Sequence, residues 1–536
     1  MRKLRAAALI LSLLLLLGGC GSSAGEIIRY DVPTGVSLLD PQFATDTTAR
    51  MIISNTFEGL YRQLPDGEVV PRLAESSEVS GDGLVWTFHL RRDAVWNASS
   101  SRSAFHEAPV TAHDFAFALS RMFDPAAFSP FAGEFSSVKN ASLILSGAAP
   151  QSSLGVRALD DYTLEITLIR QDSRLPELLS ASYAMPCSRE FFESTRARYG
   201  FDIGSLLCNG PFYLYNWNND RVISLRRNRH YLDDQPVVAR GVDLYTPGAA
   251  DGAEPAARFL AGETDACKVS FSDLPAVEDA GGQVASFEDT VWVLLLNGHK
   301  EPLANTNIRQ AVAYSVNRSL FEGRLPGNLR AADTLVPPAI LWQGESFRAR
   351  AGETGPLVSS PDLAKRCYVA GLEDLGRSAL PLGELLVCEG NNQRALAGYV
   401  QQGLQRSLGL FAGLNVLPQE EALERVREGD FDAAIVPLSA AYSSPDALLS
   451  LFRSGSGQNW AGYSNADFDA LLDSASTLSG VELFDAYRQA ETLLLEDGAV
   501  IPLYFETSYY ASGKGVTGIG FSPFLTGVSF QSADRE

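Results

Sequence analysis

Residues 55 to 96 read NTFEGLYRQLPDGEVVPRLAESSEVSGDGLVWTFHLRRDAVW, and this stretch joins the end of a predicted helix to a predicted strand. Residues 44 to 60, ATDTTARMIISNTFEGL, predict a helix that is capped at Thr45 or Asp46 and stopped by Gly59. In the segment LVWTFHLR, apolar and polar side chains alternate, which predicts a strand with one buried face. The stretch therefore indicates that helices and strands are mixed in the same domain.

The same mixture continues along the rest of the chain. VTAHDFAFALSRMFDP (110–125) predicts a helix with a capping box formed by Thr111 and Asp114. Another helix is predicted for NIRQAVAYSVNRSLF (307–321). Strands are predicted for DYTLEITL (161–168), for both halves of NGPFYLYNWNNDRVISLRRN (209–228), for VWVLLLN (291–297) and for FDAAIVPL (431–438). We therefore predict an α/β fold.

The composition is that of a globular chain with a strongly acidic charge balance. The 536 residues are 46% hydrophobic, enough for several cores, and the formal net charge is -21 with a pI of about 4.8. Such a charge repels nucleic acid and anionic lipid head groups. Nucleic acid is therefore not expected among the partners.

The N-terminus resembles a bacterial export signal. Arg2, Lys3 and Arg5 precede an apolar run from residue 6 to 17, which is shorter than the roughly 20 residues of a membrane span. The run ends in Leu-Gly-Gly-Cys, which resembles a lipobox, so we expect Cys20 to be acylated and to become the new N-terminus. The alternative is a plain signal peptide with an incidental cysteine.

Six cysteines are present, and none lies in a CxxC motif. Without Cys20 an odd number remains, so complete pairing is excluded. Export permits disulfides, and two pairs have spacings that suit small loops. The two candidate disulfides are Cys187 with Cys208, and Cys367 with Cys388.

Motifs for catalysis, metal binding and cofactor binding are missing from the sequence. The five histidines form neither HxxxH nor HExxH, and no GxSxG is present. His106-Glu107 and His113-Asp114 are expected in a solvated loop and a first helical turn. Residues 513 to 518 match GxGxxG, but the following Ile-Gly-Phe-Ser-Pro cannot form the helix that a dinucleotide site needs. We therefore expect no enzyme activity, no cofactor and no metal ion.

Several stretches, in order, resemble the family 5 extracellular solute-binding proteins, the oligopeptide- and dipeptide-binding components of bacterial ABC importers. They cover nearly all of the chain after residue 25. They are residues 55–96, PVTAHDFAFALSRMFDP (109–125), residues 209–234, NIRQAVAYSVNR (307–318), AADTLVPPAI (331–340) and AYRQAETLLLEDGAVIPLYF (486–505).

The resemblance implies a two-lobed periplasmic-binding-protein type II (Venus flytrap) fold with an extra inserted domain. It implies lobes that close on a ligand and then dock on a permease. The implied divisions are a signal peptide (1–19), a lipidated tether (20–25), lobe I (26–60, 192–290 and 506–536), the inserted domain (61–191) and lobe II (291–505).

The resemblance also implies which residues contact the ligand. The family pattern Ala-Asp-Tyr-x-x-Pro places an aspartate on the peptide α-ammonium, but here the matching residues are Ala440, Ala441 and Tyr442. Asp446 is either a substitute for that aspartate or a helix cap. Other implied ligand-binding residues are Val36 and Ser37 through their backbone groups, Ser439, and Trp460, which lines the cleft or belongs to the core.

The insertion NASSSRSAFHE (97–107) enlarges a loop that is usually short in the family, and we expect it on the surface without a ligand role.

Four functions remain open. The first is a lipid-anchored peptide receptor, monomeric, that works with ABC permease and ATPase subunits and touches the membrane through its anchor alone. The others are a receptor for a solute without a free α-amine (a modified peptide, a sugar or another small molecule), an extracytoplasmic enzyme, and a surface lipoprotein for sensing or assembly.

Overall fold

The computed structural model describes residues 25–98, 103–127, 129–232, 234, 236–250, 253–321, 323–380, 383–390, 393–524 and 527–536. The predicted export segment and the predicted lipidation site, Cys20, lie outside these residues. Among the described helices, none has both the length and the hydropathy of a membrane-spanning segment.

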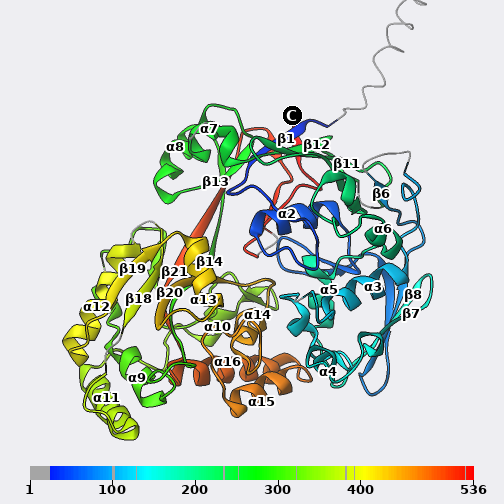
Figure 1. Ribbon diagram of the computed structural model, residues 1–536. Coiled ribbons are helices and arrows are strands. Elements are labelled where there is room, and N and C mark those ends of the chain that lie inside the picture. Colours follow the sequence, from blue (N-terminus) through cyan, green and yellow to red (C-terminus); the bar gives the residue numbers. More distant parts are fainter. Residues whose placement is uncertain are drawn as a thin grey trace, which may run out of the picture.

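One large mixed sheet runs through the molecule, and its strands order as β10-β11-β12-β1-β13-β21-β14-β20-β18-β19, with β15 paired to β21 (Figure 1). At one end, β1 lies parallel to both β12 and β13. The bounds at this end are β1 Ile27–Asp31, β10 Phe212–Asn218, β11 Val222–Arg227, β12 Gly241–Tyr245 and β13 Ala266–Val269. The predicted pair of strands in residues 209–228 is confirmed as β10 and β11.

At the other end of the sheet, β18 lies parallel to both β19 and β20. The bounds here are β15 Leu329–Ala331, β18 Glu384–Cys388, β19 Gly413–Leu417 and β20 Ala433–Ser439. Two long antiparallel strands, β14 (Gln283–Leu296) and β21 (Val500–Ser512), belong to both ends and run side by side between them (Figure 1). The sequence predicted only the last part of β14, from Val291, because that part is continuously apolar and buried.

A separate antiparallel sheet, β4-β5-β8-β7, lies on the opposite side of the molecule from strands β18, β19 and β20 (Figure 1). Its predicted strands are confirmed: Phe88 in β5 and Leu164 and Ile166 in β8 are fully buried. Helix α3 (Ala112–Met122) packs against β7 and β8 and begins with the predicted capping box of Thr111 and Asp114. The strand bounds are β4 Ala74–Val79, β5 Val85–Leu90, β7 Val156–Asp160 and β8 Thr163–Thr167.

Helix α2 (Thr47–Thr56) shows how the sequence sets an element's limits. Asp46 is its N-cap and accepts a hydrogen bond of 2.7 Å from the backbone N–H of Ala49. The helix ends at Thr56 rather than at the predicted Gly59, because Phe57 is already extended. Residues 513 to 524 contain the short strands β22 and β23 and no helix, so the GxGxxG match is not a dinucleotide site.

The remaining elements are short or cover the large sheet. The other helices are α4 Ala141–Leu145, α5 Leu175–Ser180, α6 Arg189–Ser194, α7 Pro255–Leu260, α8 Leu274–Asp279, α9 Thr306–Ser315, α10 Phe347–Ala351, α11 Pro361–Leu375, α12 Gln393–Leu408, α13 Gln419–Arg427, α14 Asp446–Leu449, α15 Ala466–Ala475 and α16 Gly480–Glu496. Short strand pairs are β2 Tyr61–Gln63 with β3 Val69–Pro71, β6 Asn97–Ala98 with β9 Leu207–Cys208, β16 Leu341–Trp342 with β17 Glu345–Ser346, β22 Val516–Thr517 with β25 Asp534–Arg535, and β23 Gly520–Phe521 with β24 Val528–Ser529.

Neither of the two candidate disulfides is formed in the structure, because every described cysteine is a free thiol. The Cys187 thiol lies 3.4 Å from a guanidinium nitrogen of Arg121, and Cys208 lies in β9. Cys367 lies on α11, whereas Cys388 is the buried last residue of β18. Burial raises the pKa of the thiols to about 12 in Cys187, Cys208, Cys267 and Cys388.

Candidate functional site

The carboxyl ends of the parallel strands define the candidate site. Strand β13 is antiparallel to β21, and its last residue, Val269, pairs with Tyr509. Strand β21 runs from the half of the sheet that contains β20 to the half that contains β1, where its last residues lie. Because β13 is antiparallel to β21, the carboxyl end of β13 points towards the half that contains β20. The parallel strands β1 and β12 point the same way, so their following loops lie on the same edge.

The parallel strands of the other half point in the opposite direction. Strand β20 is antiparallel to β14, and its last residue, Ser439, pairs with Thr290 in the middle of β14. The carboxyl ends of the two sets of parallel strands therefore face each other across the middle of β14 and β21. In open α/β sheets, ligands bind outside the carboxyl ends of the strands. The facing ends are thus the expected ligand-binding position.

Asp289 lies at the centre of this region, in a bulge of β14. The pairing of β14 with β21 shifts register between Glu288 and Thr290, which leaves Asp289 unpaired. Its Oδ1 accepts a hydrogen bond of 3.0 Å from the Ser508 hydroxyl and one of 3.2 Å from the Thr290 hydroxyl. Burial raises the pKa of the Asp289 carboxyl to about 6, although Lys268 lowers it. A desolvated carboxylate at a ligand-binding position is a candidate acceptor for a cationic group.

A buried arginine joins the domain of the β4-β5-β8-β7 sheet to the half that contains β20. Arg174 binds both oxygens of Asp172 through Nε and Nη2, at 2.8 and 2.9 Å. Its Nη1 lies 2.5 Å from Oδ2 of Asp446, the first residue of α14. The Asp446 and Asp172 carboxylates are both almost completely buried. We call Arg174, Asp172 and Asp446 the interlobe triad.

Glu134 adds a second polar contact beside the interlobe triad. Its Oε1 accepts a hydrogen bond of 2.9 Å from the side-chain amide of Gln458. Burial raises the pKa of the Glu134 carboxyl to about 7; nearby Arg174 lowers it and Asp446 raises it. The same boundary is crossed by a backbone hydrogen bond of 3.1 Å from Ser173 to Ser476. These contacts hold the two parts of the molecule together by polar groups.

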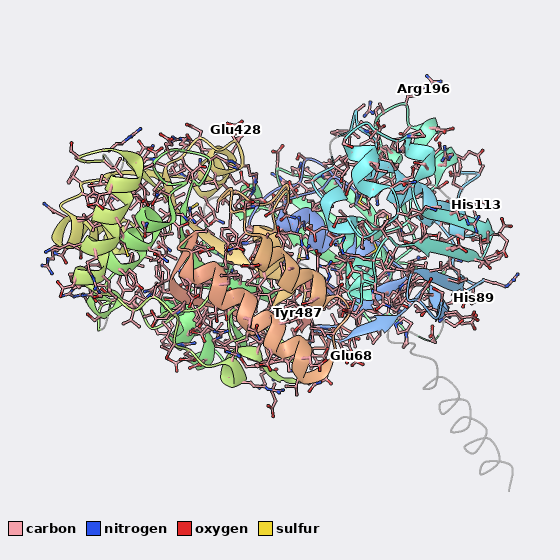
Figure 2. All side chains as sticks on the ribbon, turned by 90° about the horizontal axis from the view of Figure 1, so that it is seen from below. Glu68, His89, His113, Arg196, Glu428 and Tyr487 are labelled. Atoms are coloured by element: carbon pink, nitrogen blue, oxygen red, sulfur yellow. The ribbon has the colours of Figure 1, made fainter. Side chains whose placement is uncertain are left out.

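Asp446 has neither of its two predicted roles, which were to replace the family's ligand-binding aspartate or to cap a helix. Its carboxylate is 1% exposed and binds Arg174 and the Tyr442 hydroxyl, so it is not open to a ligand ammonium. The N-cap of α14 is Pro445, and the Asp446 side chain makes no capping hydrogen bond. Tyr442 is likewise buried and committed to Asp446. Tyr487, labelled on α16 in Figure 2, is also buried, and its pKa is raised by burial and by the charge of Asp446.

Val36 does not offer its backbone to a ligand as predicted. Its N–H donates to Oδ1 of Asn219 at 2.9 Å, and its C=O accepts from Nδ2 of the same residue at 2.6 Å. The side chain of Asn219, from the turn between β10 and β11, therefore occupies both groups. The neighbouring Ser37 is exposed.

The remaining predicted residues follow β20 or lie close to the boundary. The Ser439 hydroxyl lies 2.9 Å from that of Thr290 at the middle of β14, Ala440 is buried and Ala441 is half-buried. Trp460 is half-buried against the core, two residues from the Gln458 that binds Glu134. Sequence reasoning missed Asp289, Arg174 and Glu134, since each acquires its role from partners far away in the chain. The bulge at Asp289 has no sequence signal that we can identify.

The two sets of parallel strands face each other, and the long strands β14 and β21 run through both halves of the sheet. This arrangement is the two-lobed type II periplasmic-binding fold of substrate-binding receptors. The family model described as bacterial extracellular solute-binding proteins, family 5 middle, matches residues 68–460. The chain belongs to the bacterial extracellular solute-binding proteins of family 5. The predicted family, receptor class and extracytoplasmic location are thereby confirmed.

Individual relatives cover almost all of the chain. It is 29% identical to the probable deoxycholate-binding periplasmic protein YgiS of Escherichia coli K12, over 90% of this chain and 88% of that protein. It is 27% identical to a dipeptide-binding protein of Lactococcus lactis, over 96% of both chains. The solved structure of Listeria monocytogenes OppA bound to peptide matches with a TM-score of 0.78 and 23% identity, over 95% of this chain and 99% of that chain. This last likeness confirms the fold.

Proposed function

We propose that the protein captures peptides between two lobes and delivers them to the membrane permease of an ABC importer. The observation that carries this proposal is the opposition of the two sets of strand ends across β14 and β21. A ligand placed there contacts both halves. The dipeptide-binding relative, which is matched over 96% of its length, supports peptide as the ligand class.

The proposed lobe I comprises residues 26–60, 192–290 and 506–536, and the proposed lobe II comprises residues 291–505. The inserted domain, residues 61–191, carries the β4-β5-β8-β7 sheet. The proposed boundaries between the lobes fall in β14 directly after Thr290 and in β21 directly before Glu506. Thr290 and Glu506 pair with each other next to the bulge. We propose that this position is the hinge.

We propose that the interlobe triad forms when the lobes close. Arg174 and Asp172 come from the inserted domain, whereas Asp446 comes from lobe II. A ligand that touches both lobes stabilises the closed state, since it makes those contacts only when the lobes are shut. The ion pairs of the triad, which form only in the closed state, stabilise that state as well. The permease then distinguishes loaded from empty receptor by its shape.

A second candidate is the same receptor role for a solute without a free α-amine. The position of the family's aspartate is Ala441, and Asp446 is committed to Arg174. The deoxycholate-binding relative, whose named ligand has no amine, also favours this candidate. Both candidates share the same closure and differ in the group that the ligand presents.

Calorimetric titration separates the two candidates. Tri-alanine and its N-acetylated form are titrated into ligand-free protein, with deoxycholate as a third probe. Tight binding of tri-alanine that is lost on acetylation supports a peptide receptor with an amine site. Equal binding of both peptides, or binding of deoxycholate alone, supports the second candidate. Mass spectrometry of the recovered ligand tests the receptor role itself, because a chemically altered ligand would indicate an enzyme.

We further propose that the protein is an exported lipoprotein, anchored through acylated Cys20, that works as a monomer with permease and ATPase subunits. The lipobox-like sequence supports the anchor. Stable anchoring takes two lipid signals, which a diacylated cysteine supplies. Cys20→Ala is expected to release the protein from the membrane fraction, and its retention there would contradict lipidation. A deletion strain that imports peptides normally would favour sensing or assembly.

A further inference from the structure

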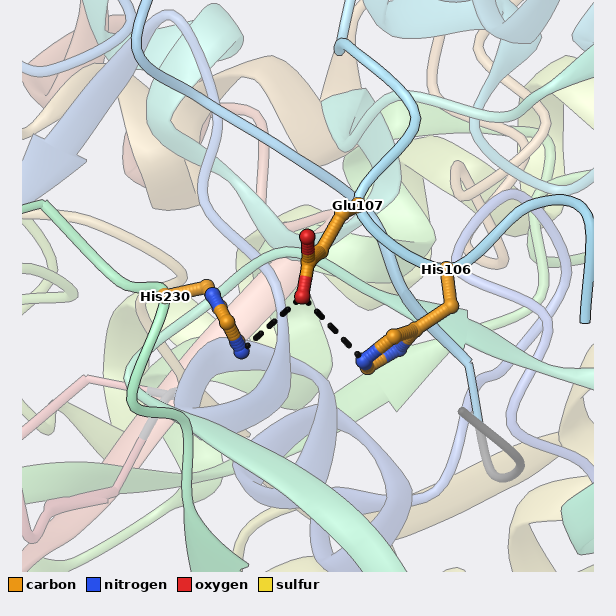
Figure 3. A group of neighbouring side chains, drawn as sticks. All are labelled: His106, Glu107 and His230. Carbon is orange, nitrogen blue, oxygen red and sulfur yellow. Dashed lines mark ion pairs between the residues drawn. The ribbon is translucent and has the colours of Figure 1, made fainter. Parts of the chain in front are cut away.

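Three side chains that can ligate a metal ion converge where the proposed inserted domain meets the proposed lobe I. His106 and Glu107 come from the loop after β6, and His230 comes from the loop after β11 (Figure 3). The Glu107 Oε1 atom lies 3.4 Å from Nε2 of His230 and 3.8 Å from Nε2 of His106. One ligand atom from each residue lies within 4.8 Å of the others. Sequence reasoning expected no metal here, because the histidines form neither HxxxH nor HExxH. His230 lies far from the other two residues in the chain, so no local motif could have shown the group.

Residues 105 to 108, which carry His106 and Glu107, are held by backbone hydrogen bonds and by ring packing. The Glu107 N–H donates to the Trp96 C=O at 2.8 Å, and the Trp96 N–H donates to the Ala108 C=O at 2.8 Å. Phe105 packs its ring edge-to-face against Phe191, with ring centroids 5.2 Å apart. The two ligand residues therefore sit on a fixed frame, although their side chains reach solvent.

The second loop is fixed to the first by buried asparagines. The Asn228 Oδ1 atom accepts hydrogen bonds of 3.0 Å from the Asn97 amide and 3.0 Å from the His230 N–H. The Asn228 amide in turn donates to the Gly210 C=O at 2.9 Å. Asn97 and Asn228 are both buried. The positions of His230 and of the His106 loop are therefore linked through the protein interior, which limits how far the ligands can move apart.

The backbone at Glu107 is in an uncommon conformation. Its φ is 62°, in the left-handed region that residues other than glycine adopt in only a few per cent of cases. In this structure the Glu107 carboxylate lies between the two imidazoles (Figure 3). Such a conformation is disfavoured locally and persists where the surrounding structure fixes it, as it does at ligand-binding positions.

The donor set fits a borderline divalent metal ion. Two imidazole nitrogens and one carboxylate oxygen are ligands of zinc, at about 2.0–2.2 Å from the ion. Tetrahedral ligands at that distance lie about 3.4 Å apart, close to the 3.4 and 3.8 Å separations here. Ligation by Nε2 of His106 puts the ring proton on Nδ1, so the 3.3 Å contact from the Ala98 N–H has to lengthen.

We propose that His106, Glu107 and His230 bind one divalent transition-metal ion of the zinc class and that water completes the coordination. The ion ties the enlarged loop of the inserted domain to the β11 loop of lobe I. The three residues belong to neither set of facing strand ends, so the ion is structural. The proposal is independent of the ligand that the lobes capture.

Zinc titration of the full-length protein, stripped with a chelator and monitored by competition with a chromophoric zinc indicator, tests the site. One ion is expected per chain. His230→Ala and Glu107→Gln are each expected to weaken binding by at least about tenfold, since loss of even an outer partner of a metal ligand costs about 10–100-fold. Zinc is also expected to raise the unfolding temperature of the wild type but not of His230→Ala.

The protein supplies matched controls. His89 with Glu78 and His113 with Asp161 are single histidine–carboxylate pairs, 3.6 and 3.5 Å apart, on the same domain (Figure 2). His89→Ala and His113→Ala are expected to bind zinc as the wild type does. Circular dichroism of His230→Ala without zinc checks that the variant is folded. Absence of binding, or equal zinc binding by the wild type, His230→Ala and Glu107→Gln, overturns the proposal.

Discussion

Arg174 and Asp446 are 272 residues apart in the chain, yet Nη1 of the guanidinium lies 2.5 Å from Oδ2 of the carboxylate. Asp446 is 1% exposed, so its charge is compensated by Arg174 and by the hydroxyl of Tyr442 rather than by water. Removing one partner of a buried ion pair typically costs about 3–5 kcal/mol, because the other charge stays buried. The pair therefore makes the boundary between inserted domain and lobe II sensitive to single substitutions.

Arg174→Ala is expected to favour the open receptor. The substitution leaves Asp172 and Asp446 without their common partner, and separation of the lobes gives both carboxylates access to water. We expect ligand affinity to fall at least about tenfold, which corresponds to about 1.4 kcal/mol. At a ligand concentration that closes most of the wild type, small-angle X-ray scattering should show a larger radius of gyration for the variant.

The control for Arg174→Ala is Arg157→Ala in the same inserted domain. Arg157 is exposed and pairs with Glu165 at 2.8 Å, so its loss should change neither scattering nor affinity. Asp446→Asn provides a second variant, because the amide removes the buried charge without removing volume. Unchanged closure in both Arg174→Ala and Asp446→Asn would contradict the role of the interlobe triad.

Glu134→Gln is expected to flatten the pH dependence of ligand binding. The pKa of the Glu134 carboxyl is raised from 4.5 to about 7 in the present arrangement, so this arrangement holds more protons than an open state with an ordinary pKa. Closure is therefore favoured as the pH falls from about 7 towards 4.5 and disfavoured as it rises. We expect wild-type affinity to increase severalfold from pH 7.5 to pH 5.5, measured by calorimetry.

The uncharged amide of Glu134→Gln removes the contribution of this carboxyl, so the affinity of the variant should rise less from pH 7.5 to pH 5.5 than that of the wild type. Glu165→Gln, on strand β8 of the inserted domain, is the control and should keep the wild-type dependence. If Glu134→Gln and wild type respond identically to pH, another group controls closure.

Asp289→Asn is expected to stabilise the protein while it weakens binding of cationic ligands. The pKa of the Asp289 carboxyl is raised from 3.8 to about 6 by burial, so ionisation destabilises the folded protein progressively between those values and fully above pH 6. Asparagine keeps the acceptor for Ser508 and removes the charge. We expect a gain on the order of 2 kcal/mol in the free energy of unfolding at pH 7.5, measured by urea denaturation.

At pH 3 the advantage of Asp289→Asn should vanish, because the wild-type carboxyl is then protonated. Asp279→Asn, at the exposed end of α8, should leave stability unchanged at both pH values. If Asp289→Asn were less stable than the wild type at pH 7.5, the hydrogen bonds and the nearby charge of Lys268 would stabilise the Asp289 carboxylate by more than burial destabilises it.

The sequence predicts those parts of the fold whose determinants are local. Asp46 caps α2, Thr111 and Asp114 form the capping box of α3, and the alternation in β5 buries Phe88. The site depends instead on partners from distant segments. The position of Asp446 after Pro445 suggests a cap or a ligand, and only the approach of Arg174 shows that it is an ion-pair partner. The cysteine spacing was equally misleading, since spacing does not report burial.

Thiol counting tests the cysteine assignment. Cys187, Cys208, Cys267 and Cys388 are buried, and their pKa values near 12 disfavour the reactive thiolate. Cys367 is half-buried, so it should react first with a chromogenic disulfide reagent under native, non-reducing conditions. In denaturant, all five cysteines of the described part of the chain should react. Detection of fewer than five in freshly purified, unreduced protein would indicate a disulfide, and Cys367→Ser identifies the fast-reacting group.

Ala441→Asp is expected to add an amine site to the receptor. Position 441 carries the aspartate in the family pattern, and here it follows the carboxyl end of β20, where Ser439 meets Thr290. Asp446 cannot serve instead, because Arg174 and Tyr442 already bind its carboxylate. A carboxylate at position 441 should favour tri-alanine over N-acetylated tri-alanine by at least about tenfold, the value of one charge-assisted hydrogen bond. Ala441→Asn, which has the same size without the charge, is the matched control in calorimetry. A preference for the free amine in Ala441→Asn as well would show that size or polarity at this position, rather than charge, selects the ligand.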